Sequence, residues 1–365
     1  MRRFFLWLHR WLGLGAALVI SFLGLTGAAL VFRPEIEANL HPNLLTVAPQ
    51  EKRVSLQPTL ERLQRRFPNR KISFLFAAKA PENSDEWWLD GGNLRVYINP
   101  YSGEILGSRH ESEGLFPFLF SAHTELFAGE TGEQIAAWSG LMLCSLTLSG
   151  LILWMPRRKS GWKNVFRLHW KTNWRGRIYE LHRLGGFYLS GLLLITALTG
   201  IALIWHDLAD QIATPFGIAK VKKAKATTGD LLSLDDLLQK ANVAFPNGEL
   251  RRIAFPAKTG APLVVRKKLP EELHPNGMNN IALDGTTGHV LSITDSRTVP
   301  SGQRLLNLRY PLHIGLWGGN ISRVIAVLVG LSPLLFSISG FLMWKAKRRN
   351  RAATSASRLH AVTQN

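Results

Sequence analysis

The stretch Leu8–Phe32, LHRWLGLGAALVISFLGLTGAALVF, decides the fold because it occurs twice in the chain. Its second copy is Leu181–Trp205, LHRLGGFYLSGLLLITALTGIALIW. Each copy contains an apolar run of about 22 residues, which is long enough to cross a bilayer as a helix. Each copy also opens with a histidine beside a basic flank. Identical residues recur 173 positions apart without a gap: His9 and His182, Arg10 and Arg183, Gly13 and Gly186, and Thr26-Gly27 and Thr199-Gly200.

Four long apolar runs occur in the chain, and none of them contains an acidic or histidine side chain. The only charge inside them is Arg323, at the edge of the last run. We therefore expect a bundle of four membrane-spanning helices with soluble segments between them, which agrees with a mean hydropathy near zero, +0.03. The four apolar runs are Trp11–Phe32, Ile135–Met155, Leu184–Trp205 and Ser322–Trp344.

The net charge of +19 does not indicate nucleic-acid binding, because the basic excess is confined to short segments beside the spans. The N-terminus, the loop 156–183 and the tail 345–365 hold 18 of the 44 Lys and Arg residues but only one acidic residue, Glu180. Basic residues beside spans mark the cytoplasmic side of a membrane. We therefore expect both termini and this loop in the cytoplasm, near anionic lipid, and the two long segments outside.

The two long outer segments share one order of predicted elements. Each begins with an amphipathic helix, at 55–67 and at 233–245, that ends in the sequence Phe-Pro-Asn. Strand-like pieces and a turn follow, with the turns Asn99–Gly103 and Asp284–Gly288. We therefore expect each outer segment to fold as one helix packed on a small antiparallel sheet. The strand-like pieces of the first segment are 71–77, 87–90, 94–98 and 104–107.

The spans that return to the cytoplasm also match each other, at an offset of 190 positions. The order span, outer domain, span therefore occurs twice, with both copies oriented alike. Such a duplication predicts a pseudo-twofold axis along the membrane normal. The matching residues are His123 and His313, Gly129 and Gly319, Ser149-Gly150 and Ser339-Gly340, and Trp154 and Trp344.

The repeated elements resemble the PepSY-associated transmembrane family, over about Arg3 to Arg349. The resemblance is carried by the span opening L-H-R…L-T-G, the turn D-G-T-T-G-H-V-L, and the closing spans S-G-L-I-L-W and S-G-F-L-M-W. It implies a haem-bearing protein of the bacterial inner membrane with PepSY-like periplasmic domains, akin to FoxB-type siderophore reductases. The first turn departs from the family pattern, because it is Asn-Pro-Tyr-Ser-Gly.

These patterns together predict a four-span α-helical membrane protein with two α+β, PepSY-like periplasmic domains. The boundaries are 1–32 for the first span, 33–132 for periplasmic domain 1, 133–155 for the second span and 156–183 for the cytoplasmic loop. The second half comprises 184–205 for the third span, 206–321 for periplasmic domain 2, 322–344 for the fourth span and 345–365 for the tail.

The repeated histidines are the candidate site. A twofold axis brings equivalent residues face to face, so His9 and His182 form one predicted pair and His123 and His313 form another. Two imidazoles are the axial ligands of a b-type haem, and the absence of C-x-x-C-H excludes covalent attachment. We therefore predict two haem b groups, one on the cytoplasmic side and one on the outer side. The alternative is that these histidines are ordinary interfacial residues.

The neighbours of the first pair suggest further roles. Gly13 and Gly186 follow their histidines by four residues, so each lies on the same helix face and leaves room for a flat macrocycle. Arg10 and Arg183 are candidates for pairing with haem propionates, or else are only topology signals. For the outer pair, His206 is a possible replacement for one of the two ligands.

No nicotinamide or ATP motif is present, so we expect electrons to come from quinol or from a separate donor protein. The leading hypothesis is a di-haem reductase that delivers electrons to ferric siderophore in the periplasm and releases ferrous iron. One alternative is a haem-free regulatory or binding protein for a periplasmic partner, and another is a siderophore permease. The sequence leaves open the siderophore, the electron donor, the oligomeric state and the residues that contact the substrate.

Overall fold

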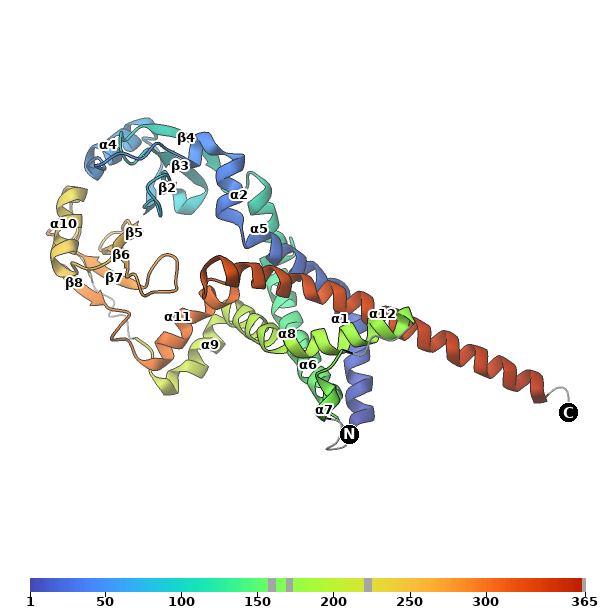
Figure 1. The fold of residues 1–365 in the computed structure, drawn as a ribbon. Helices are drawn as coiled ribbons and strands as arrows, with labels where there is room; N and C mark the ends of the chain where they lie inside the picture. The colour runs from blue at the N-terminus through green and yellow to red at the C-terminus, as the bar shows by residue number, and fades with distance from the viewer. Residues whose placement is uncertain (157–161, 169–172, 220–224, 363–365) are drawn as a thin grey trace. The chain divides into compact units, whose positions relative to one another are not determined.

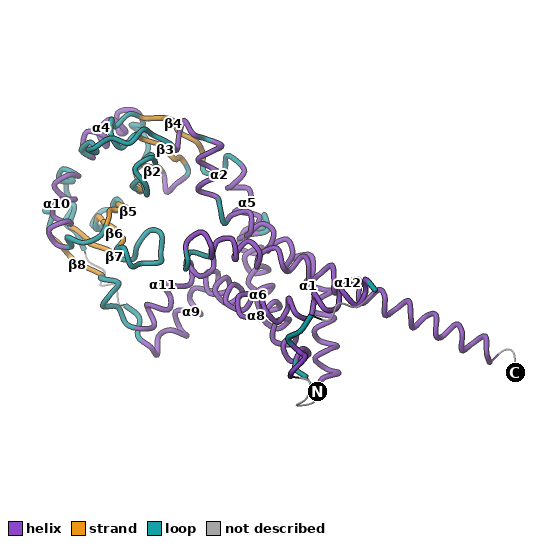
Figure 2. The backbone as a smooth tube through the Cα atoms, in the orientation of Figure 1, coloured by secondary structure: helices purple, strands orange, loops and turns teal. Residues whose placement is uncertain are grey.

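The computed structural model describes residues 1–156, 162–168, 173–219 and 225–362, and part of the predicted loop 156–183 lies outside them. The chain divides into two compact units. The helical unit comprises Met1–Val31, Leu119–His206 and Leu312–Asn365, and the sheet unit comprises Phe32–Phe118 and Asp207–Pro311. Each unit is therefore assembled from both halves of the chain. Figure 2 shows that all the strands belong to the sheet unit.

Four long helices form the helical unit, and each is long and apolar enough to span a membrane. α1 packs on α6 and α12, and α8 packs on the same two helices, so α1 and α8 occupy equivalent places in the bundle (Figure 1). The prediction of a multi-pass membrane protein is confirmed at this level. The bounds are Arg2–Leu30 for α1, Gly129–Trp154 for α6, Trp174–Ile204 for α8 and Gly319–Val362 for α12.

Two of these helices extend beyond the predicted spans. α8 begins at Trp174, within the predicted loop, where the side chain of Asn173 accepts a hydrogen bond from the Gly176 amide. α12 continues through the predicted tail to Val362. An apolar run marks only the part of a helix that crosses lipid, because backbone hydrogen bonding continues until a residue stops it.

Short helices precede the two returning spans. α5 (Leu115–Glu125) leads to α6, and α11 (Ser301–His313) leads to α12. The turns that follow need left-handed backbone, which Gly315 and Gly319 supply before α12. In the turn before α6, Leu126 and Phe127 adopt positive φ themselves. The other short helices are α2 (Arg33–Leu40), α3 (Pro42–Leu45), α7 (Trp162–Val165) and α9 (His206–Ala213).

The sheet unit contains the predicted order of elements twice. α4 (Leu56–Arg66) precedes four strands, and α10 (Leu234–Ala244) precedes four more. The sequence suggested two small sheets, but the strands form one antiparallel sheet in the order β4-β3-β2-β1-β5-β6-β7-β8. The first four strands are β1 (Ile72–Phe76), β2 (Asp85–Leu89), β3 (Leu94–Ile98) and β4 (Ile105–His110). The second four are β5 (Glu249–Ala254), β6 (Leu263–Lys268), β7 (Asn279–Leu283) and β8 (Val290–Thr294).

The two halves of the sheet unit are joined by pairing, capping and a shared core. β1 pairs with β5, with Leu75 opposite Ile253. The N-terminus of each helix is capped by the other helix: Asp235 accepts from the Leu56 and Gln57 amides, and the Gln57 side chain accepts from the Leu234 amide. One face of the sheet and both helices enclose a single apolar core. Its fully buried residues include Leu63, Leu75, Trp87, Val96, Leu237, Ile253, Val265 and Ile281.

The two predicted turns have the same hydrogen bonds although their sequences differ. Asn99 Oδ1 accepts from the Tyr101 amide, and Asp284 Oδ1 accepts from the Thr286 amide. Each turn is closed by a glycine four residues later, whose amide donates to the carbonyl of Asn99 or Asp284. An amide oxygen therefore serves as well as a carboxylate for this local bond, which explains why the first turn tolerates its departure from the family pattern.

Candidate functional site

The first predicted histidine pair comes together between α1 and α8. The ring centroids of His9 and His182 lie 6.2 Å apart, and both side chains are half-buried. Nδ1 of His9 lies 3.1 Å from the Leu146 carbonyl and 3.0 Å from the Ser149 hydroxyl of α6. Nδ1 of His182 lies 2.7 Å from the Ser339 hydroxyl of α12. Each histidine is therefore held by the neighbouring span.

The second predicted pair comes from the short helices α5 and α11. The ring centroids of His123 and His313 lie 6.1 Å apart. Nδ1 of His123 lies 2.9 Å from the Leu23 carbonyl of α1, and Nδ1 of His313 lies 3.0 Å from the Thr196 carbonyl of α8. The contacts of the two rings are therefore equivalent, as the repeat predicts.

A threonine hydroxyl completes each contact of the second pair. Thr26 Oγ1 lies 3.2 Å from Nδ1 of His123, and Thr199 Oγ1 lies 3.2 Å from Nδ1 of His313. Both hydroxyls also lie within 2.8 Å of a carbonyl one turn earlier in their own helix, Phe22 and Ile195 respectively.

The contacts of Nδ1 favour one tautomer of these imidazoles. A hydroxyl that donates to a carbonyl of its own helix can only accept from a neighbour. Ser149 donates to the Ser145 carbonyl and Ser339 to the Phe336 carbonyl, as the two threonines do to theirs. A backbone carbonyl only accepts, so Nδ1 carries the proton in His9, His123 and His313 and Nε2 keeps its lone pair; the hydroxyl contact of His182 is compatible with the same form. A metal-binding imidazole has this form, with its other nitrogen donating to a carbonyl or other acceptor.

A glycine follows each of these hydroxyl residues and lets the imidazole lie against the helix backbone. A Cβ atom on Gly27 would lie 2.7 Å from Cε1 of His123, and one on Gly200 would lie 2.9 Å from Cε1 of His313. The same distance is 3.2 Å for Gly150 and His9, and 3.7 Å for Gly340 and His182. We call Thr26-Gly27, Ser149-Gly150, Thr199-Gly200 and Ser339-Gly340 the hydroxyl–glycine dipeptides.

The spacing of each pair fits a metal ion between two imidazoles. A histidine nitrogen lies about 2 Å from a bound metal, and the centre of its ring lies about 1 Å farther away. Two rings on opposite sides of one metal therefore have centroids about 6 Å apart, close to the observed 6.2 and 6.1 Å. Among the described residues no three His, Cys, Asp or Glu side chains gather as ligands. Each histidine pair supplies two imidazoles, and a haem takes two protein ligands because its macrocycle supplies the other four.

The two pairs lie beside opposite ends of α1 and α8, because His9 and His182 belong to these helices and His123 and His313 contact them at Thr26 and Thr199. His9 and Thr26 are 17 residues apart on α1, as are His182 and Thr199 on α8. At 1.5 Å per residue, this separation is about 25 Å along the helix axis. That length is comparable with the hydrocarbon thickness of a bilayer, about 30 Å.

The family comparison agrees with this architecture. A family model described as PepSY-associated TM region matches residues 6–347, which is most of the chain. The chain belongs to the PepSY-associated TM family. None of the curated proteins compared with the chain matches it.

The glycines and arginines predicted for the first site of this PepSY-associated protein differ in what they contact. A Cβ on Gly186 would meet no atom within 4 Å, and one on Gly13 would lie 3.5 Å from Leu146. Arg183 donates to the carbonyls of Val165 and Arg167 and pairs with Glu180 at 2.7 Å. Its guanidinium is therefore bound to the segment beside α7. A propionate contact for Arg10 remains a prediction.

His206 does not take the place of an outer ligand in this arrangement. It begins α9, and its Nδ1 lies 3.2 Å from the Ile204 carbonyl. The ring that faces His123 is that of His313, which is the pairing expected from the repeat.

The hydroxyl–glycine dipeptides are functional candidates that the sequence alone did not indicate. All four were visible as repeated residues, but a chain position alone does not show which helix they face.

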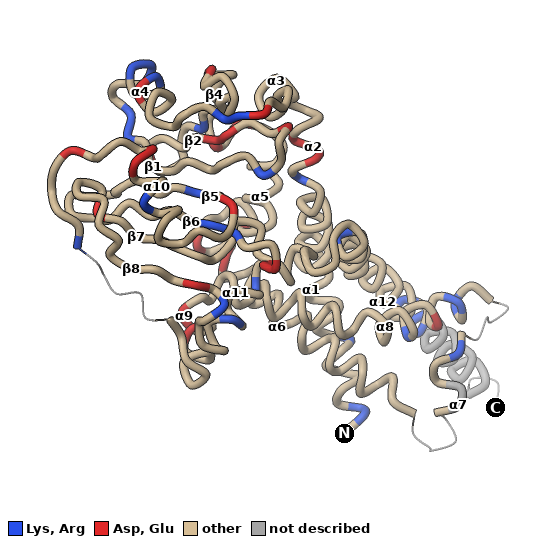
Figure 3. The backbone as a smooth tube through the Cα atoms, turned by 60° about the vertical axis from the view of Figure 1, so that its left-hand side comes forward, with Lys and Arg blue, Asp and Glu red and all other residues tan. Residues whose placement is uncertain are grey.

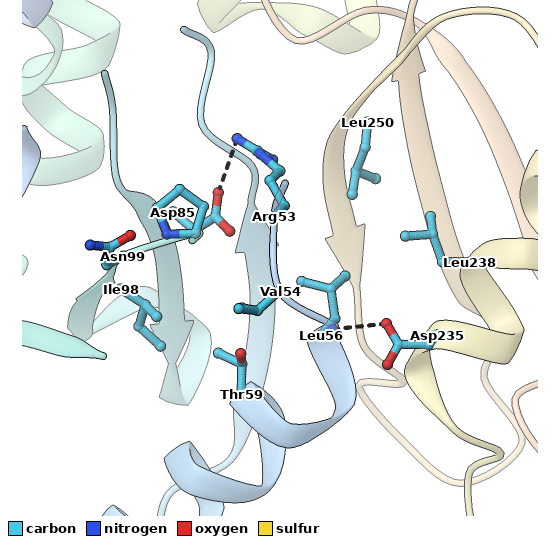
Figure 4. A pocket seen from close by; sticks show the side chains of 11 residues that line it. Arg53, Val54, Leu56, Thr59, Asp85, Ile98, Asn99, Asp235, Leu238 and Leu250 are labelled. Atoms are coloured by element: carbon cyan, nitrogen blue, oxygen red, sulfur yellow. Dashed lines mark hydrogen bonds and ion pairs between the residues drawn. The ribbon is translucent and has the colours of Figure 1, made fainter. Parts of the chain in front are cut away.

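The sheet unit contains a small pocket of about 130 Å³ (Figure 4). Its polar lining is already engaged in the fold. Asp235 caps α4, and Asp85 accepts from the Ala78 amide and pairs with Arg53 at 3.7 Å. Burial raises the pKa of Asp85, and these contacts partly oppose that rise. We therefore assign this pocket a structural role at the junction of the two halves.

Proposed function

We propose that this PepSY-associated protein is a di-haem reductase that passes electrons across a bacterial inner membrane to ferric siderophore in the periplasm. The observation that carries the proposal is the pair of facing histidine sites, with centroids 6.2 and 6.1 Å apart and Nδ1 engaged in all four rings. His9 and His182 would hold one haem b, and His123 and His313 would hold the other.

The charge distribution supports the orientation in this proposal. Figure 3 shows Lys and Arg at the N-terminal end of α1 and beside α7, whereas the long helices carry little charge along their lengths. By the positive-inside rule, the His9/His182 end then faces the cytoplasm and the His123/His313 end faces the periplasm. The sheet unit would be periplasmic in this orientation.

Haem held by two imidazoles supplies one-electron transfer. The chain's own residues would orient the ligands, because each imidazole is held at Nδ1 and those of His123 and His313 also lie closely against a glycine. One electron converts one Fe(III) of the siderophore to Fe(II), which the oxygen ligands bind more weakly. A quinol donor gives two electrons and two protons and therefore serves two ferric ions. A separate donor protein is the other possible source.

The test is a reduction assay with purified protein. We expect a quinol, but not NADH alone, to reduce the haem absorption bands. Subsequent addition of ferric siderophore should reoxidise them, with one Fe(II) trapped by a ferrous chelator per electron lost. Protein that contains no haem, or reduced haem that ferric siderophore does not oxidise, would contradict the proposed function.

A further inference from the structure

The face of the sheet opposite α4 and α10 carries a row of half-buried side chains across the β1–β5 pairing. Phe76 of β1 lies opposite Arg252 of β5, Arg252 lies opposite Arg266 of β6, and Arg266 lies opposite Asn280 of β7. The neighbouring row, which contains Leu75, Ile253 and Val265, points into the core beneath α4 and α10. Because side chains alternate along a strand, the row with the two arginines projects from the other face.

The positive charges of the two arginines in this row are not balanced by carboxylates among the described residues. Like charges directly opposite each other on a sheet are destabilising. Neither Arg252 nor Arg266 forms an ion pair with a carboxylate in the part of the chain that the structure describes, and Arg252 Nε is buried without a hydrogen-bond partner there. Arg266 Nε donates to the neutral Asn280 side chain, at 2.9 Å.

Burial and the repulsion between the two arginines change the pKa values of their side chains. Burial lowers the pKa of Arg252, and burial together with the charge of Arg252 lowers the pKa of Arg266 to about 10. Glu272 opposes the second shift, but its carboxylate already accepts from the Leu269 and Met278 amides and from Asn279. Both guanidinium groups remain charged at neutral pH, and neither has a dedicated counter-ion among the described residues.

Planar apolar groups adjoin this positive site. Phe76 and Trp88 have ring centroids 4.6 Å apart, and Phe74 lies 6.0 Å from Trp88. The guanidinium of Arg252 lies 5.4 Å from the centroid of Phe74. All three rings are half-buried. The rings are inclined to one another, with interplanar angles of 46° to 87°, so they border the two guanidinium groups without forming a flat surface. The face therefore offers two cationic donors, which suits an anion with carboxylate groups.

His274 lies near the two arginines and is uncharged. Its ring lies 5.4 Å from that of Tyr310. Burial, together with the charges of Arg266, Lys79 and Arg252, lowers the pKa of His274 to about 4. The imidazole is therefore neutral at physiological pH; its Nδ1 accepts from the Asn276 amide, which leaves Nε2 to donate a hydrogen bond.

We propose that Arg252 and Arg266 form a binding site for an anionic ferric chelate, with carboxylate oxygens of the chelate seated on the two guanidinium groups and with Phe74, Phe76 and Trp88 at the border of the site. This inference rests on the proposed function for the identity of the ligand, and it narrows the substrate class to negatively charged chelates. A bound anion would relieve the repulsion between the arginines and would give the buried Arg252 a partner.

The binding experiment uses the gallium(III) complex of citrate, which resembles ferric citrate in charge and shape but cannot be reduced under these conditions. Isothermal titration to the detergent-solubilised full chain should show saturable binding. Arg252→Gln and Arg266→Gln should each weaken that binding by at least about 10-fold. Arg70→Gln, which removes an equal charge from an exposed pair with Asp90, should leave the affinity unchanged.

The unfolding temperature without ligand provides an independent readout. Arg252→Gln and Arg266→Gln each remove one of two positive charges that repel each other, so neither variant should have a lower unfolding temperature. An unchanged or higher unfolding temperature therefore shows that weaker binding comes from loss of the site and not from failure to fold. Equal gallium citrate affinity in the wild type and both variants would overturn the site, as would absence of binding to the wild type. Neither result depends on haem. Conversely, haem-free protein that binds gallium citrate through the two arginines would contradict the reductase proposal and leave the site intact.

Discussion

The hydroxyl of Ser339 is the hydrogen-bond partner of Nδ1 of His182 among the described residues, at 2.7 Å, whereas Nδ1 of His9 has both the Ser149 hydroxyl and the Leu146 carbonyl. The two proposed ligands of one haem thus differ in the number of hydrogen-bond partners that orient their imidazoles. Substitution of each serine therefore gives two matched variants within one site.

Ser339→Ala should weaken the haem at the His9/His182 end more than Ser149→Ala does. Loss of a hydrogen-bond partner of a metal-binding histidine costs about 10–100-fold in metal affinity, and in Ser149→Ala the Leu146 carbonyl still holds His9. Haem occupancy after gel filtration, and the midpoint potential of that haem, measure the effect. Equal losses in the two variants would show that the hydroxyls do not position the ligands.

Substitution of the glycines in the hydroxyl–glycine dipeptides should reduce haem binding most where the imidazole lies closest to the glycine. Gly27→Ala and Gly200→Ala place a methyl group within 3 Å of the His123 and His313 rings, so we expect the haem at that end to be lost or its spectrum changed. Gly191→Ala, on the same helix as Gly200 and with no atom within 4 Å of the added Cβ, is the matched control and should retain both haems. Gly186→Leu tests whether the open space beside Gly186 accommodates the macrocycle, as the sequence predicts.

Acid should destabilise the sheet unit through Asp284. Hydrogen bonds from Thr227, Thr286 and Thr287 hold the pKa of this carboxyl below its ordinary value. A depressed pKa contributes stability above the unfolded-state pKa of about 4, and this stability is lost as the pH falls toward the folded-state value. Denaturant midpoints between about pH 7 and about pH 3 should therefore fall less steeply for Asp284→Asn than for the wild type. The exposed control Glu51→Gln should behave as the wild type does.

Electron flow should follow the order of the two histidine sites. His313→Ala removes one ligand at the end that we propose to be periplasmic, so siderophore reduction should be abolished while the His9/His182 haem still accepts electrons. Stopped-flow spectroscopy separates these two steps. If the variant lacked the second haem but was oxidised by ferric siderophore at the normal rate, conduction in series would be wrong.

The sequence was sufficient for the features that periodicity and repetition encode. It predicted the four long helices, the helix-then-strands order and the pairing of His9 with His182 and of His123 with His313. Each of these depends on spacing along the chain. The pairing of β1 with β5 depends instead on two edge strands finding each other, and each edge is compatible with other partners. The hydroxyl–glycine dipeptides were visible as repeats, but their contact with histidines of other helices required the packed bundle.

The central claim is that each histidine pair holds one haem, and a pyridine haemochrome assay on purified full-length chain tests it most directly. The account predicts two haem b groups per chain, with a low-spin visible spectrum before denaturation. His9→Ala and His123→Ala should each reduce the count to one six-coordinate haem, with the other lost or converted to a five-coordinate form. Haem-free protein, or four single histidine variants that all retain two low-spin haems, would contradict the account.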